Sequence, residues 1–313
     1  MAVPSDTFET FDAKGNREDL TDVIYNVSPT DTPFTTGVPV ENAQAVLHEW
    51  QTDSLADAAA NAVAEGDDAT TDAAAATTRL SNTCQIMDKV ARVSGTQESV
   101  KKGGRVSEMD YQIAKRSLEL LRDLEFNVVG VNNAEVTGSS GTARELGSIT
   151  AWITTNTSNG TSGSDGSLGN TARTDGTDRA FTESLLQTVL QSCFTNGGDP
   201  DCIMVGAFNK RAVSGFSGNA TREVSAEHGR LHSAISYFES DWGMLEIVPN
   251  RFSRPGDALV IQKDMFAIAY LRQFRLYDLA KTGDSERKQL LLEATLESRN
   301  EAASGAVWDL SES

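Results

Sequence analysis

The amino-acid sequence predicts an α+β protein whose strands pair with partners far away in the chain. Apolar residues recur at helical spacing from Ser107 to about Val131 and again after Phe181. The last third of the chain instead carries the alternating and apolar runs that are typical of sheet strands. Since helices and strands do not alternate regularly, the sequence does not predict repeated βαβ units.

The composition argues against several classes of protein. Of 313 residues, 45 are acidic and 27 are basic, which gives a formal net charge of −18. Non-specific binding to nucleic acid depends on Lys and Arg, so this balance argues against it. No run of about 18 apolar residues predicts a transmembrane helix, and the first residues do not resemble a secretion signal. Three widely spaced cysteines predict no disulfide framework.

Two segments near the start of the chain cannot form a core of their own. Residues 1–40 show no sustained periodicity, although Asn16–Asn26 is compatible with a short helix. Residues 41–79 are poor in large apolar side chains apart from a strand expected at His48–Gln51, and residues 41–78 contain no Lys or Arg. A loop of this kind is either disordered or held by a partner. Its carboxylates are Glu41, Glu49, Asp53, Asp57, Glu65, Asp67, Asp68 and Asp72.

The clearest element is the long helix after a strand-like stretch at 79–98 and a basic turn at 101–105. Ser107 and Asp110 resemble a capping box with Asp in place of Glu. About 25 helical residues would extend for about 37 Å. The apolar positions at three- and four-residue spacing are Met109, Ile113, Leu120, Leu121, Leu124 and Val128. Of these, we expect Leu120 and Leu124 to face a sheet.

The remaining elements follow from shorter patterns. Residues 132–178 are rich in Gly, Ser, Thr and Asn, and the sequence assigns no role to 154–178. A second helix after Phe181 is expected to stop at Asn196-Gly197-Gly198. A short helix is expected at 208–216. The expected strands are Cys202–Val205, Leu245–Ile247, Ala258–Ile261, Phe266–Leu271 and Leu290–Leu296.

No motif gives a convincing catalytic, cofactor or metal site. His228 and His232 have a zinc-like spacing, but Gly229 between them disfavours the helix that such a site needs. Three short patterns occur in the order found in serine β-lactamases and penicillin-binding proteins: Ser99 with Lys102, Ser217 with Asn219, and Lys281-Thr282-Gly283. Glycines directly after Lys102 would end the helix that such chemistry needs. A Ser-Lys acyltransferase is therefore the weakest alternative, and we predict no catalytic residue, cofactor or metal.

Several stretches, in order and over nearly the whole chain, carry a resemblance to a known family. They are Gly15–Tyr25, Ser28–Phe34, His48–Asp53, Glu65–Ala69, Ser94–Glu98, Phe208–Lys210, Val248–Phe252, Leu279–Asp284 and Asn300–Gly305. Together they resemble the major capsid proteins of tailed bacteriophages with the Hong Kong 97-type fold. Within that fold they are similar to a family formerly catalogued as a domain of unknown function.

The resemblance implies a division of the chain into parts. These are an N-terminal arm (1–40), an extended loop (41–79), a peripheral domain (80–140) with its spine helix (107–131), an axial domain (141–255) and a return of the chain to the peripheral domain (256–313).

The same resemblance implies a function and partners. The chain would assemble into the hexamers and pentamers of an icosahedral head that encloses double-stranded DNA without sequence-specific binding. Its location would be the virion capsid, after synthesis and assembly in the host cytoplasm. Expected partners are other copies, a portal and separate scaffolding or decoration proteins, with no membrane. An encapsulin-type nanocompartment shell is the alternative that shares the fold.

We also expect specific contacts between subunits. The arm aromatics are too widely spaced to pack together, so they should insert into neighbouring subunits: Phe8, Phe11, Tyr25 and Phe34. The acidic loop lacks Lys, which excludes an isopeptide bond from it. Trp50 and Leu55 would anchor the loop over a basic cluster on the next copy, namely Lys101, Lys102, Arg105, Lys115 and Arg116. Divalent ions bridging Asp67 and Asp68 are the competing account.

Overall fold

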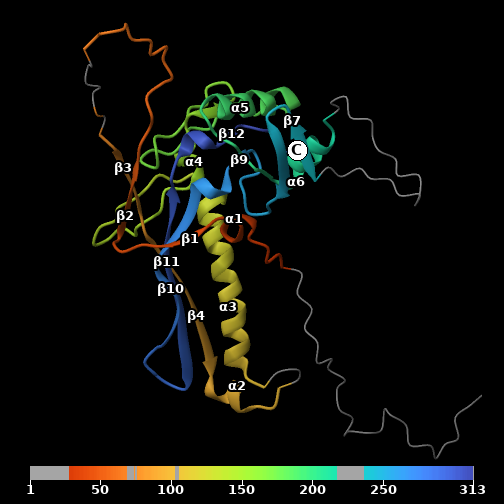
Figure 1. Ribbon diagram of the computed structural model, residues 1–313. Coiled ribbons are helices and arrows are strands. Elements are labelled where there is room, and N and C mark those ends of the chain that lie inside the picture. Colours follow the sequence, from red (N-terminus) through yellow and green to blue (C-terminus); the bar gives the residue numbers. More distant parts are fainter. Residues whose placement is uncertain (1–27, 69–73, 75, 103–105, 217–235, 313) are drawn as a thin grey trace, which may run out of the picture.

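The computed structural model describes residues 28–68, 74, 76–102, 106–216 and 236–312 (Figure 1). Within these ranges the chain forms a long helix, a four-stranded sheet, a six-stranded sheet and a two-stranded ribbon. This is the α+β organisation that the sequence predicts. Some predictions concern residues outside these ranges. In the arm they are Phe8, Phe11 and the helix at Asn16–Asn26, which includes Tyr25. Elsewhere they are Asp72, Arg105, Ser217, Asn219, His228 and His232.

The long helix α3 spans Glu108–Glu125 and continues into a π-helical turn at Phe126–Gly130. Its start is fixed by Ser107, whose hydroxyl accepts a hydrogen bond from the amide of Asp110 at 3.1 Å. The short helix α2, Gly95–Ser99, precedes it. The periodicity of the sequence therefore predicts the position of this helix correctly.

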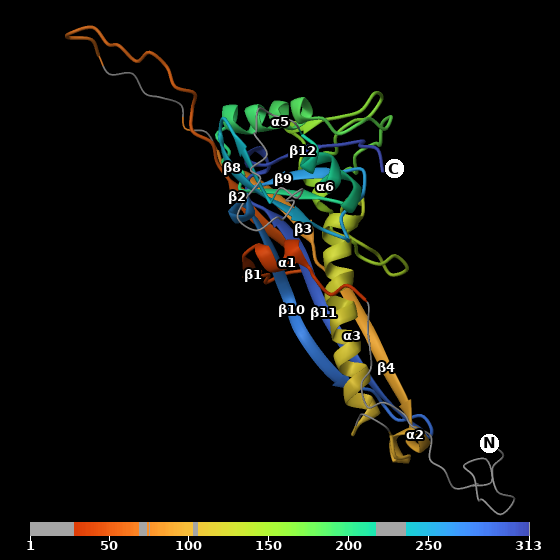
Figure 2. The same ribbon diagram turned by 90° about the vertical axis from the view of Figure 1, so that its right-hand side faces the viewer.

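A four-stranded sheet lies along one side of α3 (Figure 2). Its order is β1-β10-β11-β4, with β1 parallel to β10 and the other pairs antiparallel. The strands are β1 Val40–Asn42, β4 Gln85–Ser94, β10 Phe266–Asp278 and β11 Ser285–Ser298. Leu120 and Leu124 of α3 share one fully buried cluster with Leu292 of β11, which confirms the predicted inner face of the helix. The sequence Lys281-Thr282-Gly283 lies in the turn between β10 and β11.

A six-stranded sheet at one end of α3 has the order β5-β12-β9-β6-β8-β7 (Figure 1). Its strands are β5 Asn156–Ser158, β6 Cys202–Val205, β7 Tyr237–Ser240, β8 Gly243–Pro249, β9 Ala258–Ile261 and β12 Gly305–Val307. Ile203 of β6 packs in a cluster with helices α5 (Glu183–Thr195) and α6 (Ala207–Ser214). Met204, which points to the opposite face, belongs to the core that contains α3. The two sheets are therefore joined through one apolar core.

The strands in residues 256–313 do not all join the sheet in which they were expected. Residues 256–313 were expected to return as a whole to the layer built on α3. Only β10 and β11 do so, because β9 and β12 pair with each other and complete the six-stranded sheet. The apolar pattern predicts β9 but not the short strand β12, and it contains no information about which sheet a strand joins.

Phe34 was expected to insert into a neighbouring subunit, but the structure places it in the core of its own chain. It is 2% exposed and packs edge-on against Phe266 of β10, with ring centroids 6.0 Å apart. Helix α1 (Pro33–Gly37) holds it there, since the buried carboxylate of Glu125 accepts hydrogen bonds from the amides of Phe34 at 2.9 Å and Thr35 at 2.8 Å. The arm that is free to reach a neighbour therefore ends before α1.

Candidate functional site

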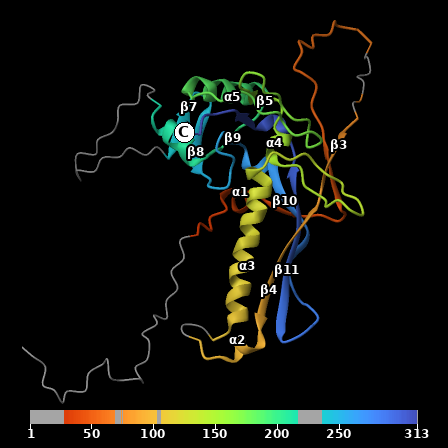
Figure 3. The ribbon, with the colours of Figure 1, turned by 180° about the vertical axis from the view of Figure 1, so that it is seen from behind.

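Among the described residues, the acidic loop after β2 extends far from the body and is carried by a two-stranded ribbon (Figure 2 and Figure 3). The ribbon pairs β2, Leu47–Thr52, antiparallel with β3, Thr78–Thr83. The described residues of the loop, 53–68, 74, 76 and 77, are all exposed. Its large apolar side chains are exposed as well, with Leu55 at 96% and Val63 at 69%.

Most carboxylates of the acidic loop remain without a cation. At its root, Glu41 pairs with Arg299 at 2.8 Å and Glu49 pairs with Arg79 at 3.4 Å. Within the described residues, the other loop carboxylates form no ion pair: Asp53, Asp57, Glu65, Asp67 and Asp68. The loop therefore presents unpaired negative charge around an exposed leucine.

Asp67 and Asp68 do not by themselves form a metal site. The amide of Asp68 donates a hydrogen bond to Oδ1 of Asp67 at 3.0 Å, and the amide of Asp67 donates to the Ala64 carbonyl at 3.2 Å, which closes the turn before them. No third potential ligand joins them in the part of the chain that the structure describes.

The root of the ribbon is fixed to its own subunit. Trp50 Nε1 donates a hydrogen bond to the Ser298 carbonyl at 2.8 Å, and its ring lies 5.2 Å from that of Trp152. His48 Nε2 lies 2.8 Å from Oε2 of Glu297. The hydrogen bonds from His48 and then Arg299 lower the pKa of the Glu297 carboxyl, against the effect of its burial. Trp50 was expected to anchor the loop to a neighbour; it is instead an anchor within the chain, because the antiparallel register of the ribbon turns it towards β11.

The predicted basic cluster is only partly available to a partner. Lys102 was expected in the cluster, but its side chain is 5% exposed and its ammonium group contacts the Glu98 carboxylate at 3.2 Å. Arg116 pairs with Glu119 one helical turn away. Lys101 and Lys115 are exposed and form no ion pair with any described residue. Among the described members of the cluster, these two lysines are the ones that can receive an external carboxylate.

The Ser99 and Lys102 side chains do not form a catalytic pair. The Ser99 hydroxyl donates to the Gly95 carbonyl at 2.8 Å, and the Lys102 ammonium group donates to the Glu98 carbonyl at 2.9 Å. Ser99 is also the last residue of α2. Each group is thus held by a backbone carbonyl of the preceding turn and not by the other.

A buried charged cluster, which the sequence does not predict, organises the Gly/Ser/Thr-rich segment 154–178. Asp309 accepts hydrogen bonds from Arg173 Nη2 at 2.7 Å, the Gly160 amide at 2.8 Å and the Gly176 amide at 2.9 Å. A Cβ atom added to Gly160 would lie 2.3 Å from the Thr177 carbonyl oxygen. The segment is therefore a close-packed loop fastened to the last residues of the chain.

Two further acidic residues, Asp175 and Asp257, extend this cluster. Arg173 is 4% exposed and also pairs with Asp175, which in turn pairs with Arg254 at 2.8 Å. Arg254 Nη1 lies 3.2 Å from Oδ2 of Asp257. Burial raises the pKa of Asp257 to about 7, although the two arginines act in the opposite direction. The density of glycines around Arg173 is the one sequence signal that could have indicated a close approach of backbone.

Comparisons with known proteins agree over almost the whole chain. The family model described as SU10 major capsid protein matches residues 5–311. The chain is 27% identical to the major capsid protein of Escherichia phage Phieco32, with 98% of each chain covered.

Two solved structures share the fold, and in both cases 96% of this chain and 98% of the other are covered. They are the capsid of cyanophage A-1(L), with a TM-score of 0.67 and 13% identity, and the capsid of a native GTA particle, with a TM-score of 0.66 and 10% identity. In the described part of this chain, no helix is long and apolar enough to cross a membrane.

Proposed function

The chain belongs to the SU10 major capsid protein family and forms the icosahedral capsid of a tailed phage, and we propose that its acidic loop joins neighbouring copies in that shell. The Hong Kong 97-type fold and the shell-forming role expected from the sequence are confirmed. The family supports neither a nanocompartment shell nor an acyltransferase. The observation that carries the proposal is the protruding loop with Leu55 and its unpaired carboxylates.

The loop would act through one apolar anchor and several weak charge pairs. Burying a leucine side chain contributes roughly 1.5–3 kcal/mol, whereas an exposed ion pair contributes at most about 1 kcal/mol. Leu55 would therefore supply most of the affinity of one contact. Lys101 and Lys115 on the next copy, together with Arg105 of the basic turn, would receive the carboxylates of the loop. Lys102 and Arg116 would support this surface through their pairs with Glu98 and Glu119.

Charge reversal tests this contact. The variant with Lys101→Glu and Lys115→Glu is expected to assemble only at higher protein concentration, because like charges would face each other at each contact. Assembly is measured by sedimentation and negative-stain microscopy at several salt concentrations, with and without EDTA. A control with Arg211→Glu and Arg251→Glu makes the same change in net charge on exposed residues elsewhere. Shells that dissociate in EDTA but tolerate the lysine variant would support ions at Asp67 and Asp68 instead.

We propose that the arm before α1 makes the second contact between subunits. Phe8, Phe11 and Tyr25 would insert into neighbours, while Phe34 keeps the base of the arm in its own core. Deletion of residues 2–30 is expected to leave a folded subunit that cannot close shells, because α1 and its contacts remain. Circular dichroism reports folding and electron microscopy reports closure. Normal particles from the deletion variant would refute this role of the arm.

The remaining assignments follow the family layout. The layer around α3 with β10 and β11 would be the peripheral domain, and the six-stranded sheet with α5 would be the axial domain near the centre of each ring of subunits. The shell would enclose DNA without sequence-specific contacts, as its net charge of −18 favours weak binding. Assembly would take place in the host cytoplasm with a portal and separate scaffolding or decoration proteins. We propose no catalytic role, since Ser99 and Lys102 are held apart by their own backbone contacts.

A further inference from the structure

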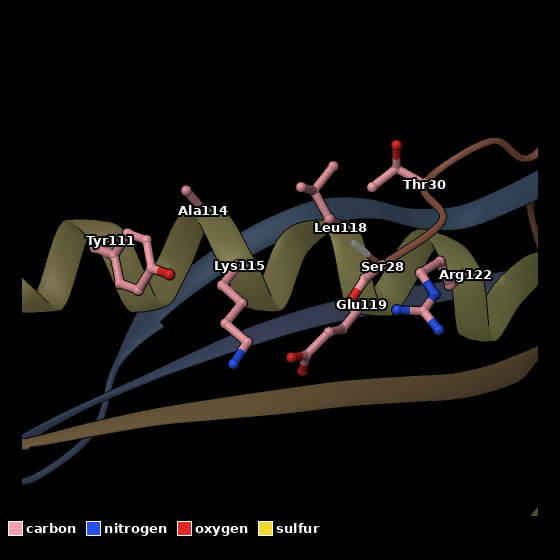
Figure 4. A pocket seen from close by; sticks show the side chains of 8 residues that line it. All are labelled: Ser28, Thr30, Tyr111, Ala114, Lys115, Leu118, Glu119 and Arg122. Atoms are coloured by element: carbon pink, nitrogen blue, oxygen red, sulfur yellow. The ribbon is translucent and has the colours of Figure 1, made fainter. Parts of the chain in front are cut away.

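Helix α3 carries a second, exposed stripe on the side away from the four-stranded sheet. Leu118 is 44% exposed in this stripe, although Leu120 two residues later is fully buried. The stripe forms one wall of a groove of about 230 Å³ with mostly apolar walls (Figure 4). The groove is lined by Ser28, Thr30, Tyr111, Ala114, Lys115, Leu118, Glu119 and Arg122.

The arm of the same chain starts at this groove. Ser28, the first described residue, lies at the Arg122 end beside α3 (Figure 4). From Arg122 to Tyr111 the helix rises by about 16 Å, a distance that about five residues of extended chain cover. The five residues before Ser28 are Val23, Ile24, Tyr25, Asn26 and Val27, of which four are apolar.

Connectivity favours the same occupant. A segment tethered directly at Ser28 has an effective local concentration that a second copy does not reach without other contacts. We propose that residues 23–27 of the same chain occupy this groove and fix the direction in which the arm leaves the subunit.

This position of residues 23–27 in the groove is compatible with the contact between subunits proposed above for Tyr25. An extended segment presents alternate side chains to opposite sides. Four extended residues before Ser28 cover about 13 Å, so Ile24 lies beside Ala114 in the groove, and Tyr25 points away from α3 towards a neighbour. The groove orients the arm, and the aromatic residues beyond it make the contact.

A pair of introduced cysteines tests whether residues 23–27 occupy the groove. The variant with Ile24→Cys and Ala114→Cys is treated with diamide, both as unassembled subunits and as shells, and analysed on denaturing gels without reductant. The native thiols interfere little, because Cys84, Cys193 and Cys202 are buried and burial raises their pKa values to about 11, 12 and 12. We expect a faster-migrating monomer, which is the product of a bond within one chain, in both preparations. Since unassembled subunits suffice, a failure to form shells leaves this test intact.

Two further variants make the outcome specific. A control with Ile24→Cys and Val106→Cys places the second thiol at a 99% exposed site just before α3 and is expected to form no such bond. Leu118→Trp, which fills the groove, is expected to cause loss of the bond in the first variant. Disulfide-linked dimers from Ile24→Cys with Ala114→Cys would overturn the proposal in favour of the arm of a second copy. Dimers formed only by Leu55→Cys with Leu118→Cys would overturn it in favour of the acidic loop of a neighbour.

Discussion

The variant Leu124→Asp is expected to prevent the subunit from folding. Leu124 is fully buried in the cluster that α3 shares with both sheets. Removing a buried leucine costs about 2–5 kcal/mol, and an aspartate at that position would add an unpaired charge in an apolar environment. The sum is comparable to the whole stability of a typical domain, about 5–15 kcal/mol.

The measurement is the soluble yield of the variant, followed by chemical denaturation of whatever remains soluble. Leu118→Asp is the matched control, because it introduces the same change at a 44% exposed position of the same helix. The control is expected to lower the free energy of unfolding by less than about 1 kcal/mol, as for most surface substitutions. Soluble Leu124→Asp protein that forms shells would show that this face of α3 is not a core.

The second large effect is expected from Asp309→Asn. The backbone at Asp309 has a φ of 58°, a left-handed conformation that Asn tolerates as well as Asp. The substitution therefore leaves the backbone unstrained and changes only the charge and one acceptor. It leaves the buried guanidinium of Arg173 without one of its two carboxylates and turns an amide group towards backbone N–H donors. Breaking a buried pair in this way costs about 3–5 kcal/mol.

The pH dependence of this loss identifies its cause. Burial would raise the pKa of Asp309, but the hydrogen bonds from Arg173, Gly176 and Gly160 outweigh it and lower the pKa. A lowered pKa in the folded state contributes stability above the unfolded pKa, and this contribution disappears as pH falls through the folded value. The difference between wild type and Asp309→Asn should therefore be largest near neutral pH and shrink in acid. Asp178→Asn, at an exposed residue, is the control, and a pH-independent loss would contradict the role of the charge.

The sequence predicts those parts of the fold that depend on residues close together in the chain. Helix α3 is predicted because Ser107, Leu120 and Leu124 follow rules of spacing and capping that need no tertiary information. Strands within β10 and β11 are predicted for the same reason, at Phe266–Leu271 and Leu290–Leu296. In contrast, the sheet that β9 and β12 join depends on pairing across the fold, which their apolar patterns do not encode.

The same limit explains the errors at the candidate site. Phe34 was expected at an interface because the aromatic residues of the arm are too widely spaced to pack together, and Trp50 because the acidic loop cannot form a core of its own. Each instead finds its partners more than 90 residues away in the chain. Lys102 was expected in a free basic cluster because spacing alone does not distinguish a pair with Glu98 from an exposed side chain. The Asp309 cluster joins residues up to 149 positions apart, and the sequence indicates it only through the glycines around Arg173.

The fixed base of the β2–β3 ribbon has a consequence for how subunits fit into a closed shell. Trp50 and His48 bind the base of β2 to β11, whereas the described loop residues beyond Thr52 are exposed. Half of the loop, about 12 residues, can reach about 40 Å when extended. In the loop contact proposed above, one chain would bridge unequal gaps to its neighbours while every contact at the base is kept. Identical subunits would then curve by different amounts around the fivefold and sixfold axes of an icosahedral shell.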